Sequence, residues 1–310
     1  MAPVRVGVVD IGTNSTRLLV ADVDRGRIAE VDRRSEVTRL GDGVDASGRL
    51  SDEAQARVFA VLDVYAAAIE EHGCEVTTGV LTSAVRDAAN GEQFRDEVRR
   101  RYGVNANVID GDTEARLTYL GATAERPAGE GPLVVIDIGG GSTEYVVGEG
   151  ARMTFHVSTQ AGVVRQTERH LHSDPPGREQ LAALADEVRA IIAEGVPAEV
   201  RESVVAAVGV AGTATSCAAI DQELEPYDPA RVQGYRLAAG ALELMLARLA
   251  EMDLERRRHV AGLHPDRAPT IVAGVVILLE ALRAFGLDEV EVSEHDILWG
   301  AALTVAADRG

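Results

Sequence analysis

The chain has no lysine, and the 31 basic residues counted among its 310 residues are all arginine. A Gly-x-x-x-x-Gly-Lys phosphate-binding loop is therefore excluded. Any side-chain cation that contacts a phosphate must be a guanidinium group, which is planar and always charged. Cysteine is scarce as well: Cys74 and Cys217 lie far apart, without metal-ligand spacing. This scarcity argues against a disulfide framework and a zinc site, and it predicts two small core residues.

Long hydrophobic runs and an excess of positive charge are also missing. Hydrophobic residues make up 46% of the chain, but no run reaches the roughly eighteen uninterrupted apolar residues of a membrane span. The first residues lack the basic and apolar regions of a signal peptide, so we expect a soluble, cytoplasmic protein. The net charge of −19 argues against nucleic acid and anionic membranes as partners. A polyanionic ligand would have to be held locally.

Two related glycine-rich turns are the most informative motifs that are present. Asp10-Ile11-Gly12-Thr13-Asn14-Ser15 and Asp137-Ile138-Gly139-Gly140-Gly141-Ser142-Thr143-Glu144 each follow a short apolar run. Such a run predicts a buried strand that delivers a carboxylate and a tight turn to one edge of a sheet. The amides of such a turn can converge on one anion, which small residues let approach closely. The pair of turns suggests a cleft that grips a phosphate chain from both sides.

The order of strands and helices predicts an α/β fold in two halves. Strands are expected at 4–10, 17–23, 27–36, 75–82, 107–110, 133–137, 143–147, 153–158 and 204–210, and helices at 51–73, 93–101, 178–194, 238–252, 267–284 and 297–307 and from residues 112, 162 and 213. Segment 125–132 carries two prolines and two glycines, which predicts domains at 1–125 and 126–310. The repeated order of strand, Asp-Ile-Gly turn, two strands and helix indicates an internal duplication.

A third turn of small residues, Gly209-Val210-Ala211-Gly212-Thr213, follows the strand at 204–210. Taken alone, this turn is explained by a helix N-terminus that Thr213 caps. Together with the other two turns it becomes a candidate third wall of the same cleft.

The three turns together resemble the sugar kinase, actin and heat-shock ATPase superfamily. Within it, the chain is similar to the exopolyphosphatase and guanosine pentaphosphate phosphatase family, in its short two-domain form. The similar segments are 10–15 with Arg17-Leu18-Leu19, 82–90, 111–117, 137–144, 209–216 and 266–274. The resemblance implies two ribonuclease H-like (actin-like ATPase) domains with mixed sheets flanked by helices and an active site in the interdomain cleft.

The resemblance also implies a reaction. It is the hydrolysis of a terminal phosphoryl group from inorganic polyphosphate, or from the 5′ end of guanosine pentaphosphate, with Mg²⁺ or Mn²⁺ as cofactor. The family's tendency to dimerise predicts a homodimer. The short form predicts a preference for short or medium polyphosphate chains.

Site residues follow from the motifs and the resemblance together. Phosphoryl transfer needs groups that hold the phosphates and one group that orients water. The expected phosphate-binding residues are Gly12, Thr13, Asn14, Ser15, Arg86, Gly139, Gly140, Gly141, Ser142, Thr143, Gly212 and Thr213. Asp137 and Glu144 carry oxygen ligands that suit Mg²⁺. Asp10, the equivalent carboxylate of the first half, is a further metal candidate that would act through water.

Glu114 matches the family's catalytic glutamate, which orients the attacking water. A structural explanation is also open: Asp112 would cap the helix, and Glu114 in its first turn would interact favourably with the helix dipole. Arg17 and Arg267 lie within matching motifs, so contacts to phosphate or to the turns are expected, with Arg267 as a structural clamp in the alternative. Asn90 could equally be a helix cap.

The turns alone would also serve a kinase or ATPase of the same fold. Glu114 and segment 82–90 favour the phosphatase. A non-enzymatic sensor of phosphate chains or nucleotides is an alternative of a different class.

Overall fold

The structure is a computed structural model that describes residues 3–126 and 131–308. The chain divides into two compact units. The first comprises Met1–Glu125 and Asp296–Gly310, and the second comprises Arg126–His295. The division after residue 125 coincides with the predicted boundary. The last helix differs from the prediction, because it packs in the first unit and not with the rest of 126–310. Residues 127–130 of the predicted linker lie outside the described residues.

The first unit is built on a mixed sheet with the strand order β3-β2-β1-β4-β5. Its strands are β1 (Val4–Ile11), β2 (Ser15–Asp24), β3 (Arg27–Val37), β4 (Val76–Leu81) and β5 (Asn105–Val108). β1 pairs antiparallel with β2 and parallel with β4. The β2–β3 hairpin turns at Arg25 and Gly26, and both have the positive φ that a two-residue type I′ turn requires.

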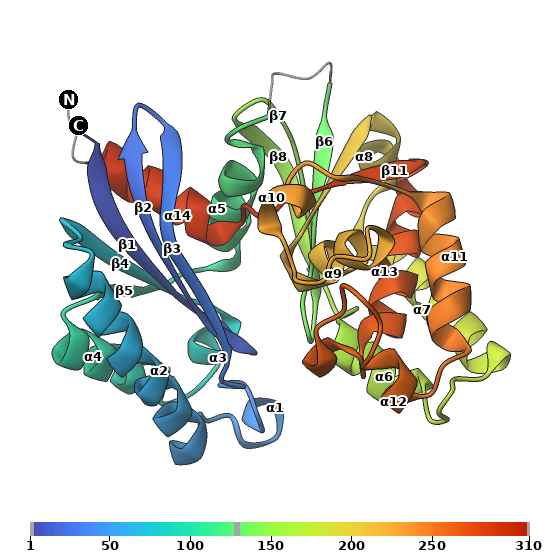
Figure 1. Ribbon diagram of the computed structural model, residues 1–310, viewed down its shortest axis with the longest axis horizontal. Coiled ribbons are helices and arrows are strands. Elements are labelled where there is room, and N and C mark those ends of the chain that lie inside the picture. The colour runs from blue at the N-terminus through green and yellow to red at the C-terminus, as the bar shows by residue number, and fades with distance from the viewer. Residues whose placement is uncertain (1–2, 127–130, 309–310) are drawn as a thin grey trace. The chain divides into compact units, whose positions relative to one another are not determined.

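Helices cover both faces of this sheet, because side chains of β1 alternate between two hydrophobic cores. Val9 and Ile11 belong to the core shared with α2 (Asp52–Glu71) and α4 (Gly91–Tyr102). Val6 and Val8 belong to the core shared with α5 (Gly111–Thr123) and α14 (Ile297–Ala307). Figure 1 shows the red C-terminal helix α14 behind the blue strands of the first unit, on the sheet face that it covers with α5. Two short helices, α1 (Val44–Ser47) and α3 (Ser83–Arg86), complete the unit.

The second unit has a mixed sheet with the order β10-β11-β9-β6-β7-β8. Its strands are β6 (Leu133–Ile138), β7 (Thr143–Glu149), β8 (Arg152–Thr159), β9 (Ala206–Val210), β10 (Arg236–Ala238) and β11 (Glu289–Val292). The helices are α6 (Val163–His170), α7 (Arg178–Gly195), α8 (Ala198–Ser203), α9 (Ala211–Asp221), α10 (Pro229–Val232), α11 (Ala239–Ala250), α12 (Leu254–Arg257) and α13 (Ile271–Phe285), with a 3₁₀ turn at Pro265–Arg267. All residues of the apolar segment 271–279 are buried in the core of this unit.

The two sheets confirm the predicted duplication. The order β3-β2-β1-β4-β5 of the first unit recurs as β8-β7-β6-β9-β11 in the second. In each unit the first strand pairs antiparallel with the second and parallel with the fourth. Both Asp-Ile-Gly turns therefore follow the central strand at its carboxyl end, where ligands bind in open α/β sheets.

Several element boundaries differ from the prediction. Strands β10 and β11 were not predicted, because they are only three and four residues long. The helix expected at 267–284 begins at Ile271, since Pro269 is placed where a continuous helix would need its amide hydrogen bond. α5 begins at Gly111, and its cap is Asp110, which accepts a 2.8 Å hydrogen bond from the Thr113 amide. The predicted cap Asp112 was wrong.

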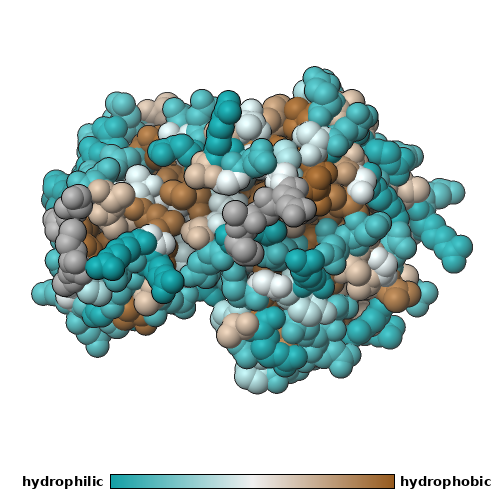
Figure 2. Space-filling view, turned by 90° about the horizontal axis from the view of Figure 1, so that it is seen from above, coloured by the Kyte–Doolittle hydropathy of each residue, from teal (hydrophilic) through white to brown (hydrophobic). Residues whose placement is uncertain are grey.

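The surface and the cysteines are consistent with the composition. Hydrophilic residues predominate on the face shown in Figure 2, and hydrophobic residues lie there in scattered groups. No helix within residues 3–126 and 131–308 has the length and apolarity needed to cross a membrane. Cys217 is buried, and burial raises its pKa to about 12, whereas Cys74 is half-buried. Both thiols are free.

Helices α5 and α14 cross at two glycines. A Cβ atom on Gly121 would lie 1.9 Å from the Asp296 carbonyl oxygen, and one on Gly300 would lie 1.9 Å from that of Leu117. We expect Gly121→Ala to lower the free energy of unfolding by about 1–3 kcal/mol, because the new methyl group meets backbone that cannot rotate away.

Gly111→Ala is the control on the same helix, because a Cβ atom there meets nothing within 4 Å. It should be neutral or stabilising, since alanine favours helix more than glycine does. Denaturant unfolding of both variants measures the difference. Equal stability of the two would contradict the proposed close crossing.

Candidate active site

Turn 12–15 connects β1 to β2 and is anchored through its carbonyl groups. The Gly12 amide donates a 2.9 Å hydrogen bond to the Ser15 carbonyl, and the Asn14 carbonyl accepts from the amides of Thr38 and Arg39. The amides of Thr13 and Asn14 donate to no acceptor in the described part of the chain. Two amides at a tight turn, left without an acceptor, suit an anionic ligand.

Arg86 and Glu114 lie close together in the same unit as this turn. The Thr13 hydroxyl contacts the Ser83 hydroxyl of α3 at 2.9 Å, and Arg86 ends the same short helix. The Arg86 guanidinium donates to the Ile109 carbonyl at 3.1 Å and to Glu114 Oε2 at 3.4 Å. The two side chains are 34% and 28% exposed, so a ligand can reach both. Turn, guanidinium and carboxylate thus form one connected group.

Glu114 lies in the first turn of α5, as expected. Its amide donates to the Asp110 carbonyl at 3.0 Å, and its side chain extends to Arg86. Glu114 therefore does lie where the helix dipole favours a carboxylate, and this position does not exclude a catalytic role. A partly exposed carboxylate beside an arginine can accept a hydrogen bond from water while the arginine contacts an anion.

Asp10 is paired with Arg17, which also pairs with Asp296. Asp10 Oδ2 accepts from Arg17 Nε at 2.8 Å, and Arg17 also pairs with Asp296, the N-cap of α14. Burial raises the pKa of Asp10, and the Arg17 ion pair offsets part of that rise. Asp10 Oδ1 is buried and has no hydrogen-bond partner in the described structure. Arg17 is thus engaged by carboxylates of its own unit.

The second turn, 139–142, has the same internal bond as the first. The Gly139 amide donates to the Ser142 carbonyl at 2.9 Å. The amides of Gly140 and Gly141 donate to no acceptor among residues that the structure describes. The three-residue spacing of the bond is identical in the two units, so both turns present their tip amides in the same way.

The residues flanking the two turns differ in charge. In the first unit Asp10 lies opposite Arg17 across the β1–β2 pair. In the second unit Asp137 lies opposite Glu144 across the β6–β7 pair. Directly opposed residues lie on one face of a sheet, and like charges there repel. Glu144 Oε1 accepts hydrogen bonds from the Ser142 and Ser158 hydroxyls, at 2.6 and 2.7 Å. Two facing carboxylates of this kind suit a cation.

The start of helix α6 is hydrogen-bonded to the second turn. The amides of Val163 and Val164 donate to the carbonyls of Gly139 and Gly140, at 2.9 and 2.8 Å. A Cβ atom on Gly162 would lie 2.3 Å from the Gly140 carbonyl oxygen, so only glycine fits there. Arg165 Nε donates to the Gly141 carbonyl at 3.0 Å. The sequence motifs did not single out Arg165, because its contact with the turn depends on the position of α6.

The third turn lies at the same sheet edge as the second, since β9 runs parallel to β6 and directly beside it. Arg267 covers this turn: a Cβ atom on Gly212 would lie 1.5 Å from a guanidinium nitrogen of Arg267. The clamp alternative for Arg267 therefore describes its observed contact. Thr213 is buried within the first turn of α9 and is not its cap, which is Val210.

Other predicted positions have local structural contacts. Asn90 is buried and occupies the N-cap position of α4, as the cap alternative predicted, but its side chain makes no capping hydrogen bond. It bonds both the amide and the carbonyl of Leu50, at 2.9 and 3.0 Å. Thr16 and Thr143, at equivalent places after the turns, are fully buried. The Thr143 hydroxyl donates to the Ala161 carbonyl at 2.6 Å, so this side chain supports the turn.

The predicted site residues thus form two groups, one in each unit. Turn 12–15, Arg86, Glu114 and Asp10 belong to the first unit, whereas turn 139–142, Asp137, Glu144 and the turn at Gly212 belong to the second. No cluster of three or more His, Cys, Asp or Glu side chains with metal-binding geometry occurs within residues 3–126 and 131–308.

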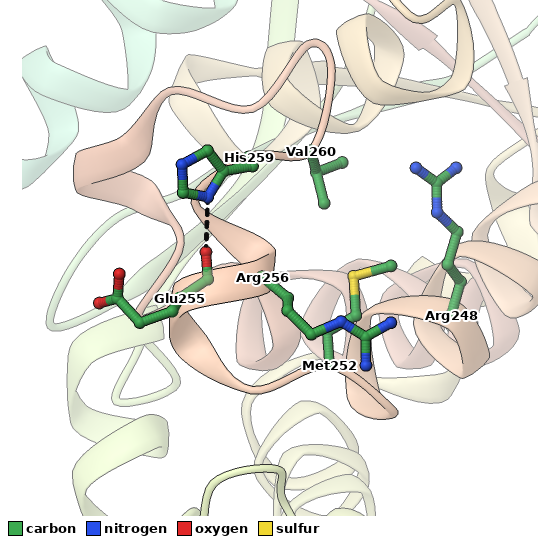
Figure 3. Close-up of a pocket in the computed structure, with 6 residues that line it drawn as sticks. All are labelled: Arg248, Met252, Glu255, Arg256, His259 and Val260. Atoms are coloured by element: carbon green, nitrogen blue, oxygen red, sulfur yellow. Dashed lines mark hydrogen bonds between the residues drawn. The ribbon is translucent and has the colours of Figure 1, made fainter.

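A separate pocket of about 510 Å³ lies in the second unit (Figure 3). It is lined by Arg248, Met252, Glu255, Arg256, His259 and Val260, none of which is a predicted site residue. The His259 ring is held by a 2.8 Å hydrogen bond between Nδ1 and the Glu255 carbonyl.

Comparison with known proteins assigns the family. The sequence profile of the Ppx/GppA phosphatase family matches residues 19–300. Exopolyphosphatase 2 of Mycobacterium tuberculosis is 39% identical, over 99% of this chain and 100% of the relative. Exopolyphosphatase 1 of Mycobacterium bovis is 32% identical, over 93% of this chain and 84% of the relative.

The fold agrees with this assignment. The crystal structure of the Aquifex aeolicus Ppx/GppA family member superimposes with a TM-score of 0.88 at 32% identity, and 99% of each chain is covered. The two mixed sheets flanked by helices are therefore the actin-like two-domain fold that the motifs predicted. With its paired Asp-Ile-Gly turns, the chain belongs to the Ppx/GppA phosphatase family of hydrolases.

Proposed function

We propose that this phosphatase is an exopolyphosphatase, which releases terminal orthophosphate from inorganic polyphosphate. The observation that carries the proposal is the Arg86–Glu114 pair, which is linked to the amides of turn 12–15 through α3. It combines a carboxylate that can orient water with groups that bind an anion. The relatives named exopolyphosphatase, at 32–39% identity, support the same substrate.

The roles follow from the chemistry of the anhydride bond. Tip amides and guanidinium groups hold the phosphates, and Glu114 accepts a hydrogen bond from water. The water oxygen forms a bond to the terminal phosphorus, and the anhydride P–O bond breaks. The electron pair of that bond leaves with the shortened chain, and the water proton passes toward Glu114.

A divalent cation fits the second unit on the chemistry of its donors. Asp137 and Glu144 face each other across β6 and β7, and Mg²⁺ binds proteins through one or two carboxylates plus waters and phosphate oxygens. We therefore propose these two residues as ligands of Mg²⁺ or Mn²⁺. When bound, the ion would neutralise charge on the phosphate oxygens. Asp10 would act only through Oδ1, since Oδ2 is paired with Arg17.

Glu144→Gln should raise the Mg²⁺ concentration needed for half-maximal phosphate release by about tenfold or more, the effect expected from loss of a metal-site residue. The amide can still bond Ser142 and Ser158, so the local structure should persist. Glu149→Gln, on the exposed end of the same strand, is the control and should leave the titration unchanged. If both variants titrate like the wild type, Glu144 is not a ligand.

The proposed activity is tested by phosphate release from polyphosphate, guanosine pentaphosphate and ATP, measured side by side. Highest kcat/KM on polyphosphate supports the proposal. Preference for guanosine pentaphosphate identifies the 5′-phosphohydrolase alternative, and preference for ATP the ATPase alternative. Binding of polyphosphate without turnover would identify a sensor. A cytoplasmic homodimer is part of the proposal, and light scattering tests the assembly.

A further inference from the structure

Arg165 lies directly against the second glycine-rich turn. Its Nε donates to the Gly141 carbonyl at 3.0 Å. A Cβ atom on Gly141 would lie 3.8 Å from one of its terminal nitrogens, so the guanidinium covers this residue of the turn. The contact fixes the orientation of the whole group.

Backbone hydrogen bonds between α6 and the turn hold Arg165 in place, in addition to the bond made by its side chain. Val163 and Val164, the two residues before it, donate their amides to the carbonyls of the same turn. Gly162 packs so closely on the turn that no side chain fits. The start of α6 and turn 139–142 are therefore one rigid piece, and the guanidinium is presented beside the tip amides of Gly140 and Gly141.

The charges near the turn explain why an anionic ligand would need a cation there. Asp137 and Glu144, which flank the turn, are both acidic, and the chain as a whole carries −19. A phosphate chain that approached amides alone would meet this negative field. Because lysine is absent, a permanently charged side-chain cation at this turn must be an arginine, and Arg165 is held there by Gly141. The next arginine on the helix, Arg169, pairs with Glu187.

We propose that Arg165 binds a phosphate of the polyphosphate chain at turn 139–142, together with the amides of Gly140 and Gly141. This inference rests on the proposed function and adds a residue to its substrate site. We assign to Arg165 a phosphate that is not transferred, so its contact contributes equally in the ground state and in the transition state. Such uniform binding lowers KM and leaves kcat nearly unchanged.

Arg165→Gln tests the proposal, because glutamine can still donate to the Gly141 carbonyl but carries no charge. We expect KM for polyphosphate to rise by about 10- to 100-fold, the range for loss of one charge-assisted hydrogen-bonded contact, with kcat within about threefold. Arg169→Gln, one turn further along the same helix, where the side chain is exposed and pairs with Glu187, is the matched control and should leave KM unchanged. Thermal unfolding of both variants should match the wild type.

Calorimetric binding of inorganic tripolyphosphate, measured alongside, separates this inference from the proposed function. If the wild type hydrolyses polyphosphate and Arg165→Gln changes neither KM nor tripolyphosphate affinity, the inference is overturned and the function stands. If the wild type shows no turnover but Arg165→Gln weakens tripolyphosphate binding, the function is overturned and the inference stands. A fall in kcat or in unfolding temperature with KM unchanged would mean that Arg165 only supports the turn, and this too would overturn it.

Discussion

Replacing Glu114 by glutamine should reduce phosphate release from polyphosphate by a factor of about 10² to 10⁴, the usual contribution of a positioned proton-accepting group. Glutamine has nearly the same shape, and it can still contact Arg86 through its carbonyl oxygen, but it cannot accept the proton of the attacking water. The measurement is kcat at saturating polyphosphate. Tripolyphosphate binding should persist, since turn 12–15 and Arg86 are unchanged.

The control is Asp112→Asn in the same first turn of α5. This change removes a carboxylate from the same helix dipole, so it reproduces any general electrostatic effect on the helix. Activity should remain within a few-fold of the wild type. If Glu114→Gln lost no more activity than Asp112→Asn, Glu114 would serve the helix terminus alone, and the catalytic role would have to be abandoned.

Arg17→Met should destabilise the first unit more than any surface substitution. Arg17 pairs with Asp10 and Asp296, whose side chains are 5% and 8% exposed. Methionine would leave two buried carboxylates without their cation, and breaking a buried pair in this way costs about 3–5 kcal/mol. The loss would be seen as a lower free energy of unfolding in urea or guanidinium chloride.

Arg5→Met is the matched control for this substitution. Arg5 pairs with Asp22 across the same two strands, but these side chains are 36% and 30% exposed. Water already screens this pair, so its loss should change stability little. Equal effects of the two substitutions would show that the Arg17 network contributes no more than a surface ion pair.

The Arg17→Met loss should also depend on pH. Arg17 lowers the pKa of Asp10, which burial raises, so the pKa of Asp10 should rise further in the variant. A carboxyl group with a raised folded-state pKa contributes stability that is present below its unfolded pKa and lost as pH rises through the folded value. The deficit relative to the wild type should therefore be larger at pH 7 than at pH 5. A constant deficit would argue against an unpaired Asp10 as its cause.

The sequence predicted the parts of this protein that depend on neighbouring residues. Apolar runs that end in Asp-Ile-Gly predicted β1 and β6 and the turns that follow them, and Ser51 predicted the start of α2. Local patterns carry this information because strand alternation, tight turns and helix caps involve residues only a few positions apart. The family and its fold followed from these motifs in combination.

Contacts between distant segments could not be predicted in the same way. The pairing of the short strands β10 and β11, the hydrogen bonds between Asn90 and Leu50, and the burial of Thr213 depend on such contacts and were missed. The cap of α5 was assigned to Asp112 in place of Asp110, since either aspartate suits the local pattern. Arg165 had no recognisable signal, because an arginine in a helix is usually solvated. The prediction that the two turns face each other across a cleft stays a prediction.

The glycine-rich turns, their strands and the lack of lysine can be read from the sequence alone: they predict two phosphate-binding turns and leave arginine as the only permanently charged side-chain cation. Only the tertiary structure showed how these parts are arranged. Asp10 lies opposite Arg17 in one unit, and Asp137 lies opposite Glu144 in the other. Arg86 is hydrogen-bonded to Glu114, and α14 packs in the first unit. Strand register and close helix crossing depend on segments up to hundreds of residues apart, so only the folded structure reveals them.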